Sequence, residues 1–134
     1  MNGEQAPARI VEIGEGNFES EVLQSKQPVL VEFSAAWSRP CHVLDSVLDG
    51  VATACATKVK VIRINADDNP ELSLWYDIQS IPTLLYFAAG KLRARIVGTA
   101  SKEAILAKLQ AVSPSGDAKS LAPFQSQEYE HHDL

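Results

Sequence analysis

The sequence predicts an α/β protein whose central, mixed, five-stranded sheet is flanked by helices on both faces. Strand-like and helix-like segments alternate through the first half of the chain, which favours parallel strands joined by crossover helices. Two further strand-like segments follow one another across a short turn, which indicates an antiparallel hairpin. The chain has 134 residues, 46% of them hydrophobic, and this is the size of one domain with a substantial core.

The first predicted elements are two strands separated by a helix. Residues 9–13 are rich in strand-forming side chains, and Asn17 is a favourable N-cap for a helix over residues 18–25. Residues 28–33 form a nearly unbroken apolar run, which is typical of a central strand buried on both faces. Glu32 is the acidic exception within this run.

The longest predicted helix begins near Ser38 and extends to Cys55. Pro40 is compatible with it because proline is tolerated in the first helical turn. A continuous helix would place Cys41 and Cys55 about 21 Å apart, beyond the ~7 Å Cα limit of a disulfide, so we expect two free thiols in a reducing compartment. The apolar stripe of this helix consists of Val43, Leu44, Val47, Leu48, Val51, Ala52 and Cys55.

A strand, a short helix, a hairpin and a last helix complete the predicted domain. Residues 58–66 are rich in strand-forming side chains, and the Asn69-Pro70 pair begins a short helix through Tyr76. The hairpin strands are residues 81–87 and 92–97, joined by a turn that contains a glycine. The last helix is capped by Ser101, and its apolar face carries Ile105, Leu106 and Leu109.

We expect a flexible arm over residues 1–7, a domain over residues 8–112 and an acidic, disordered tail over residues 113–134. The tail holds four acidic residues and one lysine, so it carries −3 of the net charge of −5. Its apolar surface is too small to offset the entropy of ordering. The rest of the chain is mildly acidic, which argues against a nucleic-acid-binding face and against a polybasic membrane-binding segment.

No export signal or membrane-spanning run is recognisable in the sequence. Residues 1–16 lack a basic segment followed by an apolar core, and no apolar run approaches the ~20 residues of a spanning helix. The simplest interpretation is a cytoplasmic protein, although a cleaved export signal would leave the same appearance.

Four motifs occur in a diagnostic order along the chain. They are Trp37-Ser-Arg-Pro-Cys41, Asn65-Ala-Asp-Asp-Asn-Pro70, Ser80-Ile-Pro-Thr83 and Val97-Gly98. Together they resemble the thioredoxin family, in which the first motif is usually Trp-Cys-Gly-Pro-Cys, and the resemblance covers roughly residues 8–112. It implies the thioredoxin fold and a descent from protein-disulfide oxidoreductases. We expect no cofactor.

The chain departs from the family at the first sulfur. Cys-x-x-Cys chemistry needs an exposed thiolate at the first position and a second thiol one turn later. Ser38 occupies the first position, so the two-sulfur cycle is excluded, and the resemblance implies that Cys41 occupies the second, resolving position. Ser38 is interpreted as an N-cap or as a hydroxyl that positions a partner. Cys41 is a small buried hydrophobe or a monothiol whose thiolate is favoured by the helix N-terminus and Arg39.

Glu32 has two interpretations. Desolvation should raise the pKa of an acid in a buried strand. The resemblance implies that Glu32 is the counterpart of a buried aspartate that assists proton transfer at the resolving thiol. The alternative is a structural ion pair with Arg63, which matches a family lysine on the neighbouring strand. Ser34 stands where the family often has an aromatic residue, so the packing beneath the motif is expected to be looser.

A peptide-docking surface is also implied by the resemblance. Trp37, Ile81 and Gly98 correspond to the family surface on which the substrate backbone lies, and Arg39 and Pro40 of the motif are counted among the binding residues. In the family, the peptide bond that precedes the proline matched by Pro82 is cis and faces the active-site sulfurs. Trp37 has the alternative of a partly exposed ring that packs over its loop.

A metal site has little support. His42, His131 and His132 lack the close spacing of four ligands that a structural zinc site usually needs. We therefore predict no metal.

The sequence favours a protein of redox homeostasis that performs thiol–disulfide exchange through one thiol and is not an efficient dithiol reductase. The alternative is a redox-inactive binding module that uses the docking surface. The expected partner is a protein or peptide with a thiol or disulfide, or glutathione, and the expected state is a monomer or a weak homo-oligomer. An engineered replacement at Ser38 is disfavoured, because Arg39 in place of the usual glycine indicates natural divergence.

Overall fold

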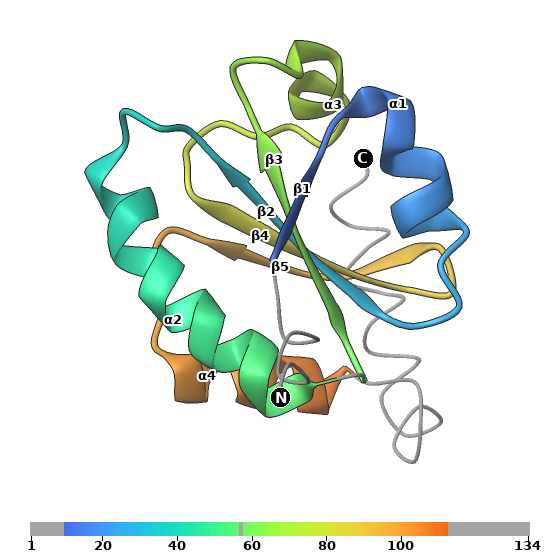
Figure 1. Ribbon diagram of the computed structural model, residues 1–134, viewed down its shortest axis with the longest axis vertical. Helices are drawn as coiled ribbons and strands as arrows, with labels where there is room; N and C mark the ends of the chain where they lie inside the picture. Colours follow the sequence, from blue (N-terminus) through green and yellow to red (C-terminus); the bar gives the residue numbers. More distant parts are fainter. Residues whose placement is uncertain (1–9, 57, 113–134) are drawn as a thin grey trace, which may run out of the picture.

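The computed structural model describes residues 10–56 and 58–112, which form one five-stranded sheet with helices on both faces (Figure 1). The strands are β1 Val11–Ile13, β2 Val29–Ser34, β3 Lys60–Asn65, β4 Thr83–Ala88 and β5 Lys91–Val97. Their order in the sheet is β1-β3-β2-β4-β5. β1 and β2 are parallel to β3, whereas β4 is antiparallel to both β2 and β5. The predicted α/β class and mixed sheet are confirmed.

The helices lie in two layers around this sheet. They are α1 Glu15–Phe18, the π-helix η1 Glu19–Leu23, α2 Arg39–Cys55, α3 Pro70–Trp75 and α4 Lys102–Ala111. α2 and α4 cover one face, and α1, η1 and α3 lie on the other (Figure 1). Within the described residues, no helix is long and apolar enough to cross a membrane. The expected arm and tail, with His131 and His132, lie outside the described residues.

β2 is the centre of the core, as its apolar sequence predicts. All six of its residues are buried. Leu30 packs with α2 and α4, whereas Val31 and Phe33 pack with the helices on the opposite face. Because successive side chains of a strand alternate between the two faces, Glu32 points to the same side as Leu30, toward α2.

The first helix begins earlier than predicted. α1 starts at Glu15 with Gly14 in the N-cap position, so the assignment of Asn17 as the N-cap is wrong. The backbone N–H of Glu15 donates to Asn69 Oδ1 at 2.9 Å, a partner 54 positions away in the chain. A long-range acceptor therefore replaces the local cap, and sequence patterns near the helix do not reveal it.

The start of α3 is satisfied by the same pair of residues. Asn69 precedes the helix in the N-cap position, in agreement with the prediction that the Asn69-Pro70 pair begins it, but its side chain makes no capping bond to α3. Instead, Glu15 Oε2 accepts hydrogen bonds from the backbone N–H groups of Glu71 at 3.1 Å and Leu72 at 3.4 Å. The carboxylate is also favourable at the positive end of the helix dipole. Glu15 and Asn69 thus join α1 to α3.

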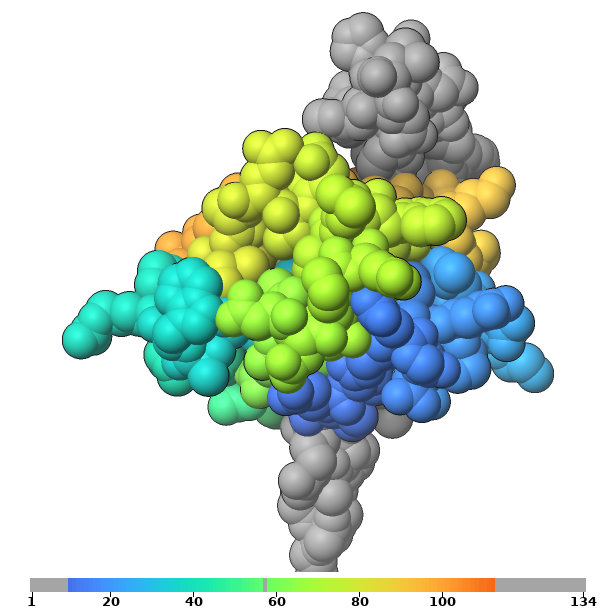
Figure 2. Space-filling view, turned by 90° about the horizontal axis from the view of Figure 1, so that it is seen from above, coloured from blue at the N-terminus to red at the C-terminus, as the bar shows by residue number. Residues whose placement is uncertain are grey.

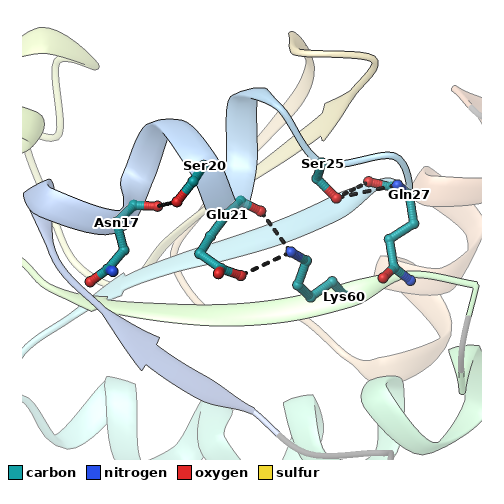
Figure 3. Close-up of polar contacts among 6 residues, drawn as sticks. All are labelled: Asn17, Ser20, Glu21, Ser25, Gln27 and Lys60. Carbon is teal, nitrogen blue, oxygen red and sulfur yellow. Dashed lines mark hydrogen bonds and ion pairs between the residues drawn. The ribbon is translucent and has the colours of Figure 1, made fainter.

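Lys60 of β3 holds the π-helix η1 against the sheet. Its Nζ donates to the carbonyl oxygen of Glu21 at 2.8 Å and lies 3.1 Å from Glu21 Oε1 (Figure 3). One ammonium group therefore satisfies a helical carbonyl and pairs with a carboxylate of the same residue.

α2 has the predicted position, with one error in its apolar stripe. Leu44, Leu48 and Val51 are fully buried, but Val43 is 56% exposed. Consecutive residues are about 100° apart around a helix, so Val43 lies beside the buried stripe, on the solvent side.

The hairpin and the last helix agree with the sequence. Ala89 and Gly90 have φ values of 54° and 76°, as a two-residue hairpin turn of type I′ requires. Ser101 Oγ accepts a hydrogen bond from Ala104 N at 3.0 Å, and Ile105 and Leu109 of α4 are buried.

Candidate functional site

Four loops meet at one end of the sheet, and the predicted motifs lie in them. Ser34 is paired with Asn65, Phe33 with Thr83, and Thr83 with Val97. The segments that continue from these positions therefore share one edge. Figure 2 shows this end, where the start of α2 in teal, the segment around α3 in green and the segment before β4 in yellow-green share one face.

Ser38 begins α2 at this edge. Its backbone is extended, with φ −89° and ψ 116°, and its Oγ accepts a hydrogen bond from Cys41 N at 3.3 Å. Ser38 N in turn donates to Ala35 O at 3.1 Å. Ser38 is therefore the N-cap of α2, and it also closes the turn that follows β2.

Cys41 lies beneath the surface of the motif. Ser38 and Cys41 are each only 3% exposed, whereas Arg39 and Pro40 are exposed. Within the described residues both cysteines are free thiols, as expected. A partner that docks on this loop therefore finds Arg39 and Pro40 exposed, but not the Cys41 side chain.

His42 ties the motif loop to the first turn of α2. Its Nε2 lies 2.6 Å from the carbonyl oxygen of Ala36, which is a hydrogen-bonding distance. A carbonyl can only accept, so Nε2 must carry the proton. Within the described residues, no group of three or more His, Cys, Asp or Glu side chains is arranged to hold a metal ion.

Trp37 stands out from the motif with 72% of its surface exposed. Its ring N–H donates to Asp67 Oδ2 at 2.8 Å, which anchors the ring to the loop between β3 and α3. Asp67 belongs to the motif of residues 65–70, but the sequence did not predict its bond to Trp37. The exposed, anchored ring is the largest apolar feature of the motif.

Pro82 and Gly98 are joined across the β4–β5 hairpin. The Ile81–Pro82 peptide bond is cis, and Gly98 N donates to Pro82 O at 2.8 Å. Gly98 has a φ of 88°, which favours glycine, and open space surrounds the position of a Cβ there. Ile81 is half-buried and packs with the core on the α1 side. Trp37, Ile81 and Gly98 thus all belong to loops at the same edge of the sheet.

Glu32 and Arg63 form an ion pair across β2 and β3. Arg63 Nε lies 3.0 Å from Glu32 Oε1, and the Glu32 side chain has no exposed surface. Burial raises the pKa of Glu32 above its ordinary value, and the hydrogen bond and charge of Arg63 oppose this rise. The site thus contains a buried carboxyl group that resists ionisation.

Asp45 is a further member of this cluster, and sequence reasoning missed it. Arg63 Nη2 lies 2.8 Å from Asp45 Oδ1, so one guanidinium contacts two carboxylates. Asp45 follows Cys41 by one helical turn, and this spacing places both on one side of α2. That signal was present in the sequence, but the pairing with Arg63 depends on how α2 packs on the sheet.

Cys55 lies at the opposite end of α2 from Cys41. It is half-buried, and burial raises the pKa of its thiol, while Lys58 has a smaller opposite effect. Cys55 is therefore a suitable internal reference for a thiol away from the motif.

The chain is similar to proteins of one family over most of its length. The family model described as Thioredoxin matches residues 9–111. The thioredoxin of Acidithiobacillus ferridurans is 42% identical over 100 residues, which are 75% of this chain and 93% of that protein. The thioredoxin of Griffithsia pacifica is 40% identical over 101 residues, or 75% and 93% of the two chains. The thioredoxin of Mycobacterium bovis is 39% identical over 105 residues, or 78% and 90%.

Proposed function

Because this chain belongs to the thioredoxin family, a family of redox proteins, we propose that it performs thiol–disulfide exchange through a single thiol, Cys41. The observation that carries the proposal is the position of Cys41 in the first turn of α2, with its amide capped by Ser38. The positive end of the helix dipole lies at this N-terminus and attracts negatively charged groups. Glu32 points to the same side of the sheet and supplies a carboxyl group for proton transfer.

In the proposed reaction, the Cys41 thiolate attacks a disulfide of a protein or peptide. One substrate sulfur forms a mixed disulfide with Cys41, and the other leaves as a thiolate, which takes up the proton that Cys41 released. Glu32 carries that proton between the two sulfurs. Because Ser38 has no sulfur, a thiol from solution, such as glutathione, must then attack the mixed disulfide, bond to the substrate sulfur and return Cys41 to a thiol.

The burial of Cys41 sets the expected rate. Cys41 is only 3% exposed, so its sulfur must be uncovered before it can react, and exchange should be slow and selective for partners that dock on the motif. The docking surface is proposed to consist of Trp37, Ile81 and Gly98, with Arg39 and Pro40 at its edge. We expect a monomer or a weak homo-oligomer that works in the reducing cytoplasm.

The first experiment compares the parent chain with Ser38→Cys. Insulin reduction in the presence of dithiothreitol measures dithiol activity, and mass spectrometry measures the labelling rate of each thiol by an aromatic disulfide. We expect insulin reduction only by Ser38→Cys, and faster labelling of Cys41 than of Cys55 in the parent. An inactive Ser38→Cys variant with an inert Cys41 would refute monothiol exchange.

The burial of the sulfur also favours a second candidate, a redox-inactive binding module that uses the same docking surface. The two candidates differ in what Cys41→Ala does. A binding module would retain a bound partner in that variant, whereas monothiol exchange requires that covalent capture of a disulfide-containing peptide be lost. Trp37→Ala is the matched control, because it should weaken docking in both cases.

A further inference from the structure

Arg63 divides its hydrogen-bonding edge between two carboxylates. The Nε and Nη2 groups of a guanidinium lie on one side, and this edge fits the two oxygens of a single carboxylate. Here Nε contacts Glu32 Oε1 at 3.0 Å, and Nη2 contacts Asp45 Oδ1 at 2.8 Å. The two-bond pairing that Arg63 could make with Glu32 is therefore not made.

As a result, the second carboxylate oxygen of Glu32 is left without a bond from Arg63. Among the described residues, no group forms a hydrogen bond with Glu32 Oε2, although this atom is buried. A buried, unpaired carboxylate oxygen is costly when the group is charged, and this cost favours protonation. The Asp45 side chain is 40% exposed, so its own charge is solvated while it occupies Nη2.

We propose that Asp45 is a positioning residue for Glu32: by occupying Arg63 Nη2, it keeps the buried carboxyl group from two-bond ion pairing and leaves Glu32 Oε2 able to exchange a proton with Cys41. The role of the proton rests on the proposed thiol chemistry. The finding that Arg63 bonds to two different carboxylates rests only on the two measured contacts.

Other charged residues lie near Glu32 and Arg63 on the neighbouring strand β1 and on α2. Glu12 of β1 is paired with Arg63 in the strand register and adds a third acid near the guanidinium. On β4, the residue opposite Glu32 is Leu84, which carries no charge. The charge of Asp45 raises the pKa of Glu32, in the same direction as burial. One arginine is thus shared among acids from β1, β2 and α2, and Asp45 is the member that contributes a direct competing hydrogen bond.

Two substitutions separate the charge of Asp45 from its hydrogen bond. Asp45→Asn removes the charge but keeps an oxygen that can accept from Nη2. Asp45→Ala removes both and releases Nη2 to pair with Glu32 Oε2. Asp49→Asn is the matched control, because Asp49 is an exposed acid one turn further along α2.

The readout is the carboxyl ¹³C titration of Glu32 in the full chain, assigned by the loss of its signal in Glu32→Gln. We expect the midpoint to move to lower pH in Asp45→Asn, to move further in Asp45→Ala and to stay unchanged in Asp49→Asn. Equal shifts in the two Asp45 variants, no shift in either, or the same shift in Asp49→Asn would overturn the proposal. A purely structural contact would change the unfolding midpoint without producing this order.

The pH dependence of Cys41 alkylation in the same variants tests the link to the thiol. Its inflection should move with the Glu32 midpoint. If Cys41 is alkylated at no pH in any variant, the proposed thiol exchange fails, while the carboxyl titration still decides whether Asp45 positions Glu32.

Discussion

Replacing Ser38 with alanine should lower the free energy of unfolding by about 1 kcal/mol, because α2 loses its N-cap. The capping bond from Cys41 N is 3.3 Å long, slightly beyond the usual range, which favours the lower part of the ~0.5–2 kcal/mol found for such substitutions. Both residues are 3% exposed, so water would not readily replace the lost acceptor, and this raises the cost. The long bond lowers the expected cost and the burial raises it, so we keep the central value of about 1 kcal/mol.

Urea denaturation of three variants tests this magnitude. Ser38→Gly should cost less than Ser38→Ala, because glycine is a better N-cap residue than alanine. Ser101→Ala removes the exposed cap of α4, where water can take over the bond to Ala104 N, so its loss should be smaller than that of Ser38→Ala. The m-value should not change in any variant. An equal or larger loss in Ser38→Gly than in Ser38→Ala would refute capping in favour of packing.

Two further predictions concern buried charge and backbone conformation. Burial raises the pKa of Glu32, so its contribution to stability is greatest below its unfolded pKa and is lost as the pH rises through its folded pKa. Glu32→Gln should therefore gain stability relative to the parent as the pH rises through this window, and parallel unfolding curves from about pH 4 to about pH 8 would contradict this sign. Gly90→Ala should destabilise by more than about 1 kcal/mol, because its φ is 76° and a Cβ would lie 2.8 Å from Leu23 O. Gly16 of α1 is exposed and has open space around the position of a Cβ, so Gly16→Ala should stabilise the protein by about 0.4–1 kcal/mol. Thermal unfolding that ranks the two variants the other way would count against the reasoning.

The helix starts show where sequence reasoning succeeded and where it failed. Ser38 and Ser101 cap their own helices through an amide three positions ahead, so a local pattern was sufficient to identify them. Glu15 and Asn69 satisfy amides 54 to 57 positions away, and the prediction of Asn17 as a cap failed for this reason. Capping by a distant side chain leaves no periodic or adjacent signal.

The candidate site divides in the same way. The ion pair between Glu32 and Arg63 was one of the two interpretations that the sequence allowed, because adjacent strands bring such positions opposite one another. The participation of Asp45 required the packing of α2 on the sheet, and the bond from Trp37 to Asp67 required the fold of the loop after β3. The roles of Cys41 as the reactive thiol and of Trp37, Ile81 and Gly98 as the docking surface stay predictions.

The sequence by itself determined the α/β class, the order of the elements, the hairpin and the family, because these depend on periodicity, turn residues and motifs read within short windows. The tertiary structure alone decided that Cys41 is only 3% exposed, and that one arginine divides its hydrogen-bonding edge between Glu32 and Asp45. These features depend on how a helix packs against a sheet. Exposure and shared hydrogen bonds belong to the three-dimensional arrangement of residues far apart in the chain, and local residue patterns do not encode them directly.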